Sequence, residues 1–473
     1  MTTIVWLRQD LRIADNPALF EAALRGPVVP VYILDETAPR PLGGASKWWL
    51  HHSLSALGQS LKPLLLLRGD PQALLLDLIG RTGADAVFWN RCYEPHAVER
   101  DKAIKAALRA QGIEARSFNG GLLHEPWELT TAAGGPFKVY SPFWRAALGR
   151  QVAPSLPAPK PEVSVPESLG DDLDDWGLLP TAPDWAAGWS QIWQPGEAGA
   201  VARLEAFLET GLAGYGILRD RPDLANVSRL SPHLHFGEIS PRQIWARCGF
   251  LGEAEPALDR DIAKFLSELG WREFSTHLIY HYPNLPERNW KAAFDAYPWR
   301  DSAADLKAWR RGRTGYPIVD AGLRELWNTG YMHNRVRMVA ASFLVKHLRL
   351  HWRHGEAWFW DTLLDADLAN NVAGWQWVAG SGADAAPYFR IFNPITQGRK
   401  FDPEGSYVRR WCSELAKLDT AYIHAPFEAP ERALSAAGIR LGETYPRPVV
   451  DHAEARRAAL AGYAAVKSAA EPS

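Results

Sequence analysis

The first 118 residues alternate between short apolar runs and longer helical patterns. Apolar runs occupy residues 3–9, 28–34, 64–67, 86–89 and 115–118, with helical patterns at 15–25, 47–61, 71–82 and 96–111 between them. Strands joined through helices pair in parallel, because each helix carries the chain back to the edge where the strand began. Parallel sheets are buried on both faces, which suits runs without polar alternation. The pattern therefore predicts an α/β domain over residues 1–130.

The first strand is not followed by a glycine-rich phosphate loop. Its continuation, WLRQDLR, has neither the GxGxxG nor the GxxxxGK[ST] pattern. Those patterns place backbone N–H groups around phosphates at the start of a helix. The sequence thus argues against an ordinary dinucleotide or nucleoside-triphosphate site in this domain.

Composition changes along the rest of the chain. Residues 131–196 are rich in proline, carry an acidic run at 171–175, and predict an extended connector that its tryptophans hold to the surface. Helical patterns dominate residues 197–473, and segments rich in Ser, Pro and Gly such as 224–242 interrupt them where a ligand would be held. Because 473 residues are too many for one hydrophobic core, we expect a parallel α/β domain, a connector and an all-α domain.

Charge and cysteine content restrict the class of protein. A formal net charge of −2 excludes a globally basic, histone-like molecule but allows a local patch of either sign. Cys92, Cys248 and Cys412 lie far apart and form no CxxC pair. We therefore expect no metal site, and we expect a reducing compartment. No apolar run approaches the roughly 20 residues that span a membrane. We expect a cytoplasmic protein that is neither exported nor inserted.

Tryptophan is unusually abundant, with 22 residues in the chain. Eleven of them fall in the 141 residues from Trp271 to Trp411. Indoles can fill a large helical core or line its seams. A cluster of this size also suits an aromatic ligand pocket, base stacking or electron transfer. Composition alone leaves these alternatives open.

The segment from Trp360 to Asp402 combines acids, amides, paired tryptophans and a basic end. An apolar stripe is formed by Leu363, Leu364, Ala366, Leu368 and Ala369. The stripe predicts that the first part is a helix from which Asp365 and Asp367 project on another side. Gly380, Ser381, Gly382 and Pro387 predict a loop after it. Side chains at a helix end and the following turn can face a ligand.

Five motifs carry a family resemblance. They are VWLRQDLRIADNPAL, SRLSPHLHFGEISPRQ, ELGWREF, YMHNRVRM and ANNVAGWQWVAGSGADAAPYFRIFNPITQGRKFD. In this order and spacing, from Ile4 to about Leu418, the chain resembles the DNA photolyase and cryptochrome family. The resemblance implies an N-terminal α/β antenna domain over residues 1–130, a connector over 131–196 and a helical FAD-binding domain over 197–473. That division agrees with the pattern of strands and helices.

The resemblance implies FAD as cofactor. The positions that match the family's FAD site are Tyr215, Ser228, Arg229, Leu230, Ser231, Arg272, Arg337, Asp365, Asp367 and Asn371. Hydroxyls and N–H groups at a helix start suit phosphates, and Arg272 would add positive charge there. The match places Asp365 and Asp367 near the flavin and ribose, Arg337 beside Asp365, and Asn371 beside the flavin N5.

The resemblance also implies an electron relay of three indoles. Trp375, Trp352 and Trp299 occupy the matching positions. An indole can be oxidised to a radical cation and re-reduced by a neighbour, which a phenyl ring does not do as readily. Trp358, Trp360 and Trp377 lie nearby in the sequence and offer a side branch.

The residues that surround a flipped cyclobutane pyrimidine dimer in the family match Glu268, Trp271, Asn334, Met338 and Trp377. Two indoles would form stacking walls, and Glu268 and Asn334 would bond base edges. Glu268 also lies four residues from Lys264 and from Arg272, so an ordinary salt bridge is the plain alternative. Asn334, Met338 and Asn371 are the choices of dimer photolyases. KWWLHHSL, WNRCYEP and FWDTLLDADL resemble the bacterial class III branch.

Binding of UV-damaged DNA requires a locally basic surface. Residues 331–411 hold ten Lys and Arg against seven Asp and Glu. The resemblance places Arg219, Arg335, Arg390 and Lys400 beside DNA phosphates, whose contacts supply affinity rather than sequence choice.

Two functions follow from the resemblance. The first is light-driven splitting of cyclobutane pyrimidine dimers by a monomeric enzyme, in which excited reduced FAD donates an electron to the flipped dimer. The alternative is a cryptochrome-like photoreceptor that signals through FAD photoreduction, but such a protein does not need the complete dimer pocket. An antenna chromophore is expected as well, with methenyltetrahydrofolate favoured, Trp48 and Trp49 as aromatic walls, and a deazaflavin as the alternative.

Overall fold

The computed structural model describes residues 1–166, 169–384 and 389–470. It contains two compact units that interleave along the sequence. The first comprises Met1–Ala213, Ser228–Pro283 and Leu364–Ala369, and the second comprises Gly214–Val227, Asn284–Leu363 and Asn370–Ser473. The expected domain boundaries at residues 130 and 196 stay a prediction.

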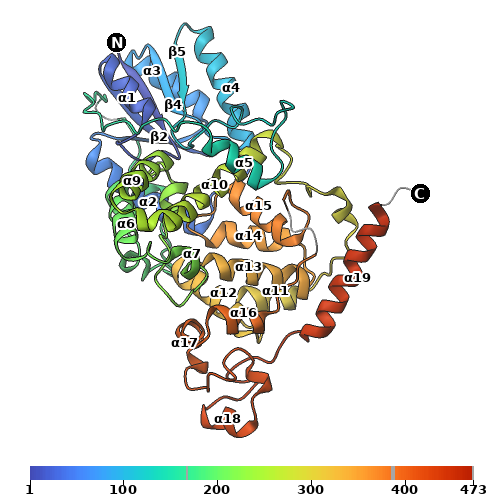
Figure 1. Cartoon of the computed structure of the whole chain (residues 1–473). Coiled ribbons are helices and arrows are strands. Elements are labelled where there is room, and N and C mark those ends of the chain that lie inside the picture. The colour runs from blue at the N-terminus through green and yellow to red at the C-terminus, as the bar shows by residue number, and fades with distance from the viewer. Residues whose placement is uncertain (167–168, 385–388, 471–473) are drawn as a thin grey trace. The chain divides into compact units, whose positions relative to one another are not determined.

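A parallel five-stranded sheet forms the core of the first unit (Figure 1). Its strands are β1 (Thr3–Leu7), β2 (Val28–Asp35), β3 (Leu65–Gly69), β4 (Ala86–Asn90) and β5 (Glu114–Phe118), in the order β3-β2-β1-β4-β5. The connecting helices are α1 (Pro17–Arg25), α2 (Gly44–Ser60), α3 (Pro71–Thr82) and α4 (Pro95–Ala110). The parallel α/β arrangement expected from the sequence is confirmed.

Local signals explain where two of these helices begin. The side chain of Asn16 accepts a hydrogen bond from the backbone N–H of Leu19, and Pro17 occupies the first turn of α1. Asp70 accepts from the N–H of Gln72 in the same way at the start of α3. An N-cap satisfies backbone donors that have no partner inside the helix, and proline tolerates the first turn because it has no N–H.

Helical segments complete the first unit. They are α5 (Tyr140–Leu148), α6 (Glu197–Thr210), α8 (Ser231–His235), α9 (Pro241–Ala254) and α10 (Asp259–His281), with short 3₁₀ turns at Asp174–Trp176, Trp189–Gln191 and Pro256–Leu258. The proline-rich stretch before α6 is held by indoles, since Trp176, Trp189 and Trp193 are all buried. Val28 also bonds Glu162 and Ser164, which attaches this stretch beside the sheet.

The chain after β1 packs directly on the α8–α9 turn. Arg12 donates to the carbonyl of Gly237, and Asp15 accepts from the Ser240 hydroxyl and the Arg242 guanidinium. Gly237 has φ +67°, and a Cβ there would lie 2.0 Å from the carbonyl oxygen of Gln9. Only glycine allows this approach. The carboxyl end of β1 is therefore held against helices that lie more than 200 residues later in the sequence.

The second unit is helical. Its elements are α7 (Tyr215–Leu218), α11 (Ala303–Arg310), α12 (Pro317–Thr329), α13 (Asn334–Ser342), α14 (Trp352–Thr362), α16 (Pro394–Phe401), α17 (Ser406–Trp411), α18 (Glu431–Ala436) and α19 (His452–Ala470), with 3₁₀ turns at η4 (Ala292–Ala296), Ser413–Leu415 and Pro426–Glu428. A π-helical turn, η5 (Phe343–His347), follows α13 without a break. Helix α15 (Leu368–Ala379) begins with two residues of the first unit and continues in the second. No helix in these described residues is long and apolar enough to cross a membrane.

One helix prediction is wrong. The stripe from Leu363 to Ala369 predicts a continuous helix, but α14 ends at Thr362 and Leu363 is extended at φ −91°, ψ 135°. Asp365 and Asp367 lie in the turn before α15. The apolar residues are buried all the same, with Leu363 2% and Leu364 0% exposed. Burial of the stripe therefore does not require helix, and aspartate, which favours turns, lies where the helix breaks.

Candidate functional site

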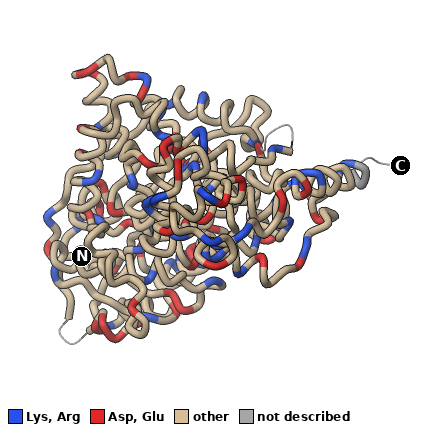
Figure 2. Tube along the Cα trace, turned by 90° about the horizontal axis from the view of Figure 1, so that it is seen from below, with Lys and Arg blue, Asp and Glu red and all other residues tan. Residues whose placement is uncertain are grey.

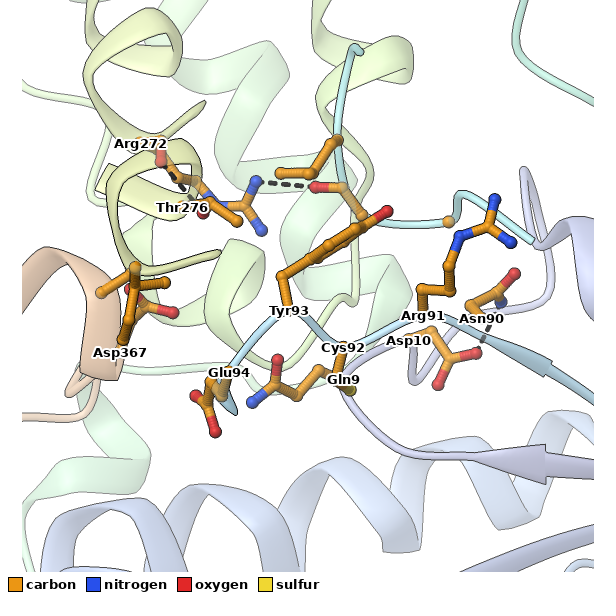
Figure 3. A pocket seen from close by; sticks show the side chains of 15 residues that line it. Gln9, Asp10, Asn90, Arg91, Cys92, Tyr93, Glu94, Arg272, Thr276 and Asp367 are labelled. Carbon is orange, nitrogen blue, oxygen red and sulfur yellow. Dashed lines mark hydrogen bonds between the residues drawn. The ribbon is translucent and has the colours of Figure 1, made fainter. Parts of the chain in front are cut away.

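A pocket opens in the first unit at the carboxyl ends of β1 and β4. These strands are neighbours, while the chain leaves β1 toward β2 and leaves β4 toward β5 on the other side. Such a switch point leaves a crevice at the strand ends where ligands bind in α/β sheets. Gln9 and Glu94 follow the two strands, Arg272 and Thr276 come from α10, and Asp367 closes the pocket (Figure 3). The empty space at this site, including the part that is open to solvent, is about 530 Å³.

The strand ends are held by a buried polar network. The amide of Asn90 donates to the Asp10 carboxylate at 2.6 Å and to the Asn16 side chain at 2.7 Å. Asp10 also accepts from the backbone N–H of Arg8, and the Arg8 guanidinium pairs with Asp101 at 2.7 Å. Hydrogen bonds among these buried groups hold them in defined positions. The backbone that carries Gln9 and Glu94 is therefore held in place at the strand ends.

Acidic groups dominate the pocket's electrostatics. Glu94 is 16% exposed, and burial followed by the negative charge of Asp367 raises its pKa to about 7. The Gln9 side chain donates a hydrogen bond to Glu94, which partly offsets the shift. Arg272 donates to the carbonyl of Gly121 at 2.7 Å and adds positive charge. The pocket suits a ligand with several hydrogen-bond donors.

Three predicted FAD residues have a common neighbour in the first unit. His235, at the end of α8, interacts electrostatically with Asp367, Asp365 and Arg272, while burial lowers its pKa. Its Nδ1 is buried and has no hydrogen-bond partner among the residues described. A buried ring nitrogen normally has a partner, so this atom is a position for a ligand group. Sequence reasoning did not single out His235, although it lies in the motif SRLSPHLHFGEISPRQ.

The predicted phosphate-binding run lies just before and at the start of α8. Arg229 has φ +53°, a conformation that is uncommon for residues other than glycine. The N–H of Leu230 lies 3.4 Å from the Ser228 hydroxyl, and Ser231 is the first residue of α8. The structure thus places Ser228, Arg229 and Leu230 directly before α8, and Ser231 at its start, in the same unit as Arg272.

The two predicted lesion residues of the first unit lie on α10. Trp271 stacks face to face on Tyr140, with ring centroids 3.7 Å apart and an interplanar angle of 9°. The Tyr140 hydroxyl donates to the carbonyl of Ser267, so both ends of this contact are held. Glu268 lies 3.5 Å from the Lys264 ammonium, which is the plain salt bridge that its spacing allows. Glu268 and Trp271 both remain partly exposed.

In the second unit, α13 presents four of the predicted residues. Asn334 is its first residue and is exposed, while Met338 is half-buried one turn later. Arg337 donates to the carbonyl of Met332 and lies over the Tyr331 ring. Arg335 pairs with Asp220 at 2.6 Å. The predicted pairing of Arg337 with Asp365 joins residues of different units and stays a prediction.

Asn371 is held in a defined orientation by Glu356. Its amide nitrogen donates to the Glu356 carboxylate at 2.8 Å and to the Glu356 carbonyl at 3.1 Å. Glu356 is 6% exposed and lies on α14. Because both bonds use the nitrogen, the amide oxygen of Asn371 points to the opposite side. The sequence did not identify Glu356, since no local pattern links positions 15 residues apart.

The three predicted relay indoles have different environments. Trp375 is 3% exposed and packs on Phe359 and Trp309, with centroids 5.0 and 6.1 Å away. Trp352 is fully buried, and its Nε1 donates to the Asn289 side chain at 2.9 Å. Trp299 is partly exposed. His351 contacts both Trp299 at 4.9 Å and Trp352 at 5.6 Å between ring centroids, so ring contacts join these two indoles.

The remaining predicted residues lie toward the surface of the second unit. Arg219 lies 5.5 Å from the Tyr215 ring centroid, Lys400 5.1 Å from that of Phe401, and Arg390 6.0 Å from that of Phe392. Lys and Arg are interspersed with Asp and Glu along most of the trace (Figure 2). Trp377 is partly buried on α15, and Pro387 lies outside the described residues.

Comparison with known proteins gives consistent matches. The family described as DNA photolyase matches residues 3–162, and the FAD binding domain of DNA photolyase matches residues 265–465. The chain is 55% identical to a deoxyribodipyrimidine photo-lyase of Agrobacterium fabrum over 98% of both chains, and 42% identical to Cryptochrome-1 of Arabidopsis thaliana over 96% of this chain and 69% of that protein. A crystal structure of a bacterial class III photolyase from Agrobacterium tumefaciens superposes with a TM-score of 0.95 at 54% identity, covering 99% of this chain and 98% of that one.

Proposed function

Because the chain belongs to the DNA photolyase family, we propose that it is a light-driven DNA repair enzyme that splits cyclobutane pyrimidine dimers. The observation that carries the proposal is the identity of 55% to a deoxyribodipyrimidine photo-lyase over 98% of both chains.

Reduced FAD, when bound and excited by light, would supply the electron that opens the dimer and would receive it back afterwards, so the reaction has no net redox change. Ser228–Ser231 and Arg272 are proposed to hold its diphosphate, and Tyr215, Arg337, Asp365 and Asp367 to surround the rest. The orphaned Nδ1 of His235 among charged neighbours supports a polar ligand here. Asn371 offers its amide oxygen to the flavin edge, since Glu356 occupies its nitrogen.

Trp271 and Trp377 are each proposed to stack on a base of the dimer. Trp271 is already backed by Tyr140, so a base stacked on its other face would extend an existing stack. Glu268 is half-buried and Asn334 is exposed, and both have polar atoms for base edges. Met338 adds an apolar contact. Arg219, Arg335, Arg390 and Lys400 are proposed to bind the flanking phosphates. Trp375, Trp352 and Trp299 are proposed to carry electrons inward when the cofactor must be reduced.

An antenna chromophore is proposed as well, methenyltetrahydrofolate rather than a deazaflavin. The aromatic walls expected at Trp48 and Trp49 take a different form in the structure. Trp49 is 0% exposed, packs on His233 and donates its Nε1 to Glu238. Trp48 contacts His52, which is half-buried, so the accessible part of this cluster is His52 rather than either indole. The chromophore released on denaturation identifies the class by its absorption spectrum.

The test of the proposed function is direct. Reduced protein is illuminated with an oligonucleotide that contains one dimer, and loss of the lesion is followed against a dark control. Light-dependent restoration of both pyrimidines is expected. Photoreduction of FAD without any dimer splitting would favour the cryptochrome-like photoreceptor instead. We also propose that the protein is cytoplasmic and monomeric. Sedimentation of the purified protein would test whether it is a monomer.

A further inference from the structure

A lysine is buried in the second unit beside the end of α15. Lys346 belongs to the π-helical turn η5 and is 1% exposed. Its Nζ donates to the carbonyl of Ala379, the last residue of α15, at 2.8 Å. The same nitrogen lies 3.0 Å from the centroid of the Phe389 ring. A single amine thus contacts two segments that lie ten residues apart in the sequence.

A second contact from α13 acts on the same part of the chain. Ser342, one turn before Lys346, is fully buried, and its hydroxyl lies 3.4 Å from the backbone N–H of Phe392. Continuous α13 and η5 therefore hold both the end of α15 and the segment that enters α16. Trp377 lies on the first of these segments and Arg390 on the second.

Packing alone does not explain a lysine at this position. Burial lowers the pKa of Lys346 well below 10.5, and no carboxylate in the described part of the chain forms an ion pair with it. A buried amine without a counter-ion destabilises the fold, and one hydrogen bond offsets only part of that loss. Methionine has similar length and volume and would fill the same space without the penalty. Retention of a destabilising group is typical of functional residues.

The charged and titratable neighbours are few. Lys291 reaches the same helix end, with Nζ 3.4 Å from the carbonyl of Gly380, but it is exposed. His347 follows Lys346 and is bonded to His452 of α19 at 2.8 Å. Backbone carbonyls at the C-terminal end of a helix carry partial negative charge, and an amine there is favourable. Of these two lysines, Lys346 is the one whose ammonium also contacts the Phe389 ring, before the segment that enters α16.

We propose that Lys346 is a positioning residue for lesion binding, which places Trp377 and Arg390 against Asn334 and Met338 of α13. The proposal rests on the proposed function, because it concerns the same pocket. Lys346 does not touch the lesion. It fixes the end of α15 and the segment that enters α16, so that Trp377 and Arg390 face the residues on α13.

The test is Lys346→Met in the full chain, compared with wild type and with Lys291→Met as the matched control. We expect the Lys346→Met protein to retain FAD and to bind a dimer-containing oligonucleotide about tenfold more weakly, the loss that one misplaced contact produces. The yield of splitting per bound dimer is expected to stay unchanged. Lys291→Met is expected to change neither quantity measurably.

Thermal stability provides a readout that separates positioning from support of the fold. The folded-state pKa of Lys346 is below the unfolded value, so wild-type stability rises as pH increases toward 10.5. Lys346→Met removes this rise and is expected to melt at a higher temperature near pH 7. Stability and lesion affinity then change in opposite directions, which a purely structural lysine would not produce.

Several results would overturn the proposal. Wild-type affinity in Lys346→Met, or a joint loss of stability and affinity, would show that Lys346 does not position the pocket. If Lys346→Met does not fold, Lys346→Gln is measured in the same way, and failure of both to fold counts against the proposal. Specific dimer binding without splitting by the wild-type protein would contradict the proposed function alone, because the affinity comparison would still test Lys346.

Discussion

The amide nitrogen of Asn371 donates to both the carboxylate and the backbone carbonyl of Glu356, at 2.8 and 3.1 Å. The two residues come from different helices, α15 and α14, that are in direct contact at this point. An amide can rotate by half a turn with little change in shape, so its orientation depends on such partners. Glu356 thus decides which atom Asn371 presents to the proposed flavin.

Substitution of Glu356 tests this relationship. In Glu356→Ala the amide of Asn371 loses its acceptor, and we expect FAD to remain bound while the one-electron-reduced flavin decays faster than in wild type. The lost buried bond should also lower the free energy of unfolding by about 1–3 kcal/mol. Flavin absorbance after illumination and chemical denaturation measure the two effects. An unchanged decay rate would show that the orientation of Asn371 does not matter.

Gly355 determines how closely Trp375 can pack. A Cβ at this position would lie 2.0 Å from a ring atom of Trp375, so the indole or the helix must move in Gly355→Ala. We expect destabilisation of about 1–3 kcal/mol and slower photoreduction of FAD. Transient absorption and thermal melting measure these quantities.

Gly374 offers a matched control for that experiment. It lies on α15 next to Trp375, and a Cβ there would meet nothing within 4 Å. Gly374→Ala should therefore stabilise the helix by about 0.5–1 kcal/mol and leave photoreduction unchanged. Equal effects of the two substitutions would contradict a specific role for the Gly355 contact.

Glu94 predicts a pH dependence with a defined sign. Its folded-state pKa of about 7 exceeds the ordinary value of 4.5, mainly through burial and then through Asp367. The folded protein therefore holds the proton more tightly than the unfolded chain, and stability falls as pH rises between these values. Glu94→Gln should remove this loss and be more stable at pH 8 by on the order of 2–3 kcal/mol, with little gain at pH 4.5.

Unfolding in urea at pH 4.5, 6 and 8 measures the effect of Glu94→Gln. Glu273 and Asp402 also have raised pKa values, about 7 and about 6, so the wild-type curve contains their contributions too. The difference between wild type and variant isolates Glu94. A difference that does not change with pH would refute the assignment.

Arg335 is engaged by Asp220 at 2.6 Å before any DNA is present. A phosphate must compete with this carboxylate for the guanidinium. We expect Asp220→Asn to strengthen binding of duplex DNA several-fold at low salt, and Arg335→Ala to weaken it and to reduce the slope of affinity against salt by about one ion. Titrations at several salt concentrations measure both. Equal salt slopes in wild type and Arg335→Ala would show that Arg335 does not meet a phosphate.

Local signals in the sequence determine most of the elements. The alternation of apolar runs and helical patterns identifies all five strands of the sheet, and Asn16 with Pro17 marks the start of α1 within two residues. These signals act over a few residues and need no tertiary context. The family motifs likewise lie in continuous stretches, so the family and its FAD-binding domain can be predicted from the amino-acid sequence alone.

Only the tertiary structure decided what those side chains meet. The helix expected across Asp365 and Asp367 is a turn, because Leu363 and Leu364 are buried without a helix and aspartate favours turns. Glu94 faces Asp367, and Lys346 reaches Ala379, across separations that no local pattern encodes. Burial, pKa and hydrogen-bond orientation depend on packing between distant segments. The sequence determined which residues are available, and packing decided which of them act together.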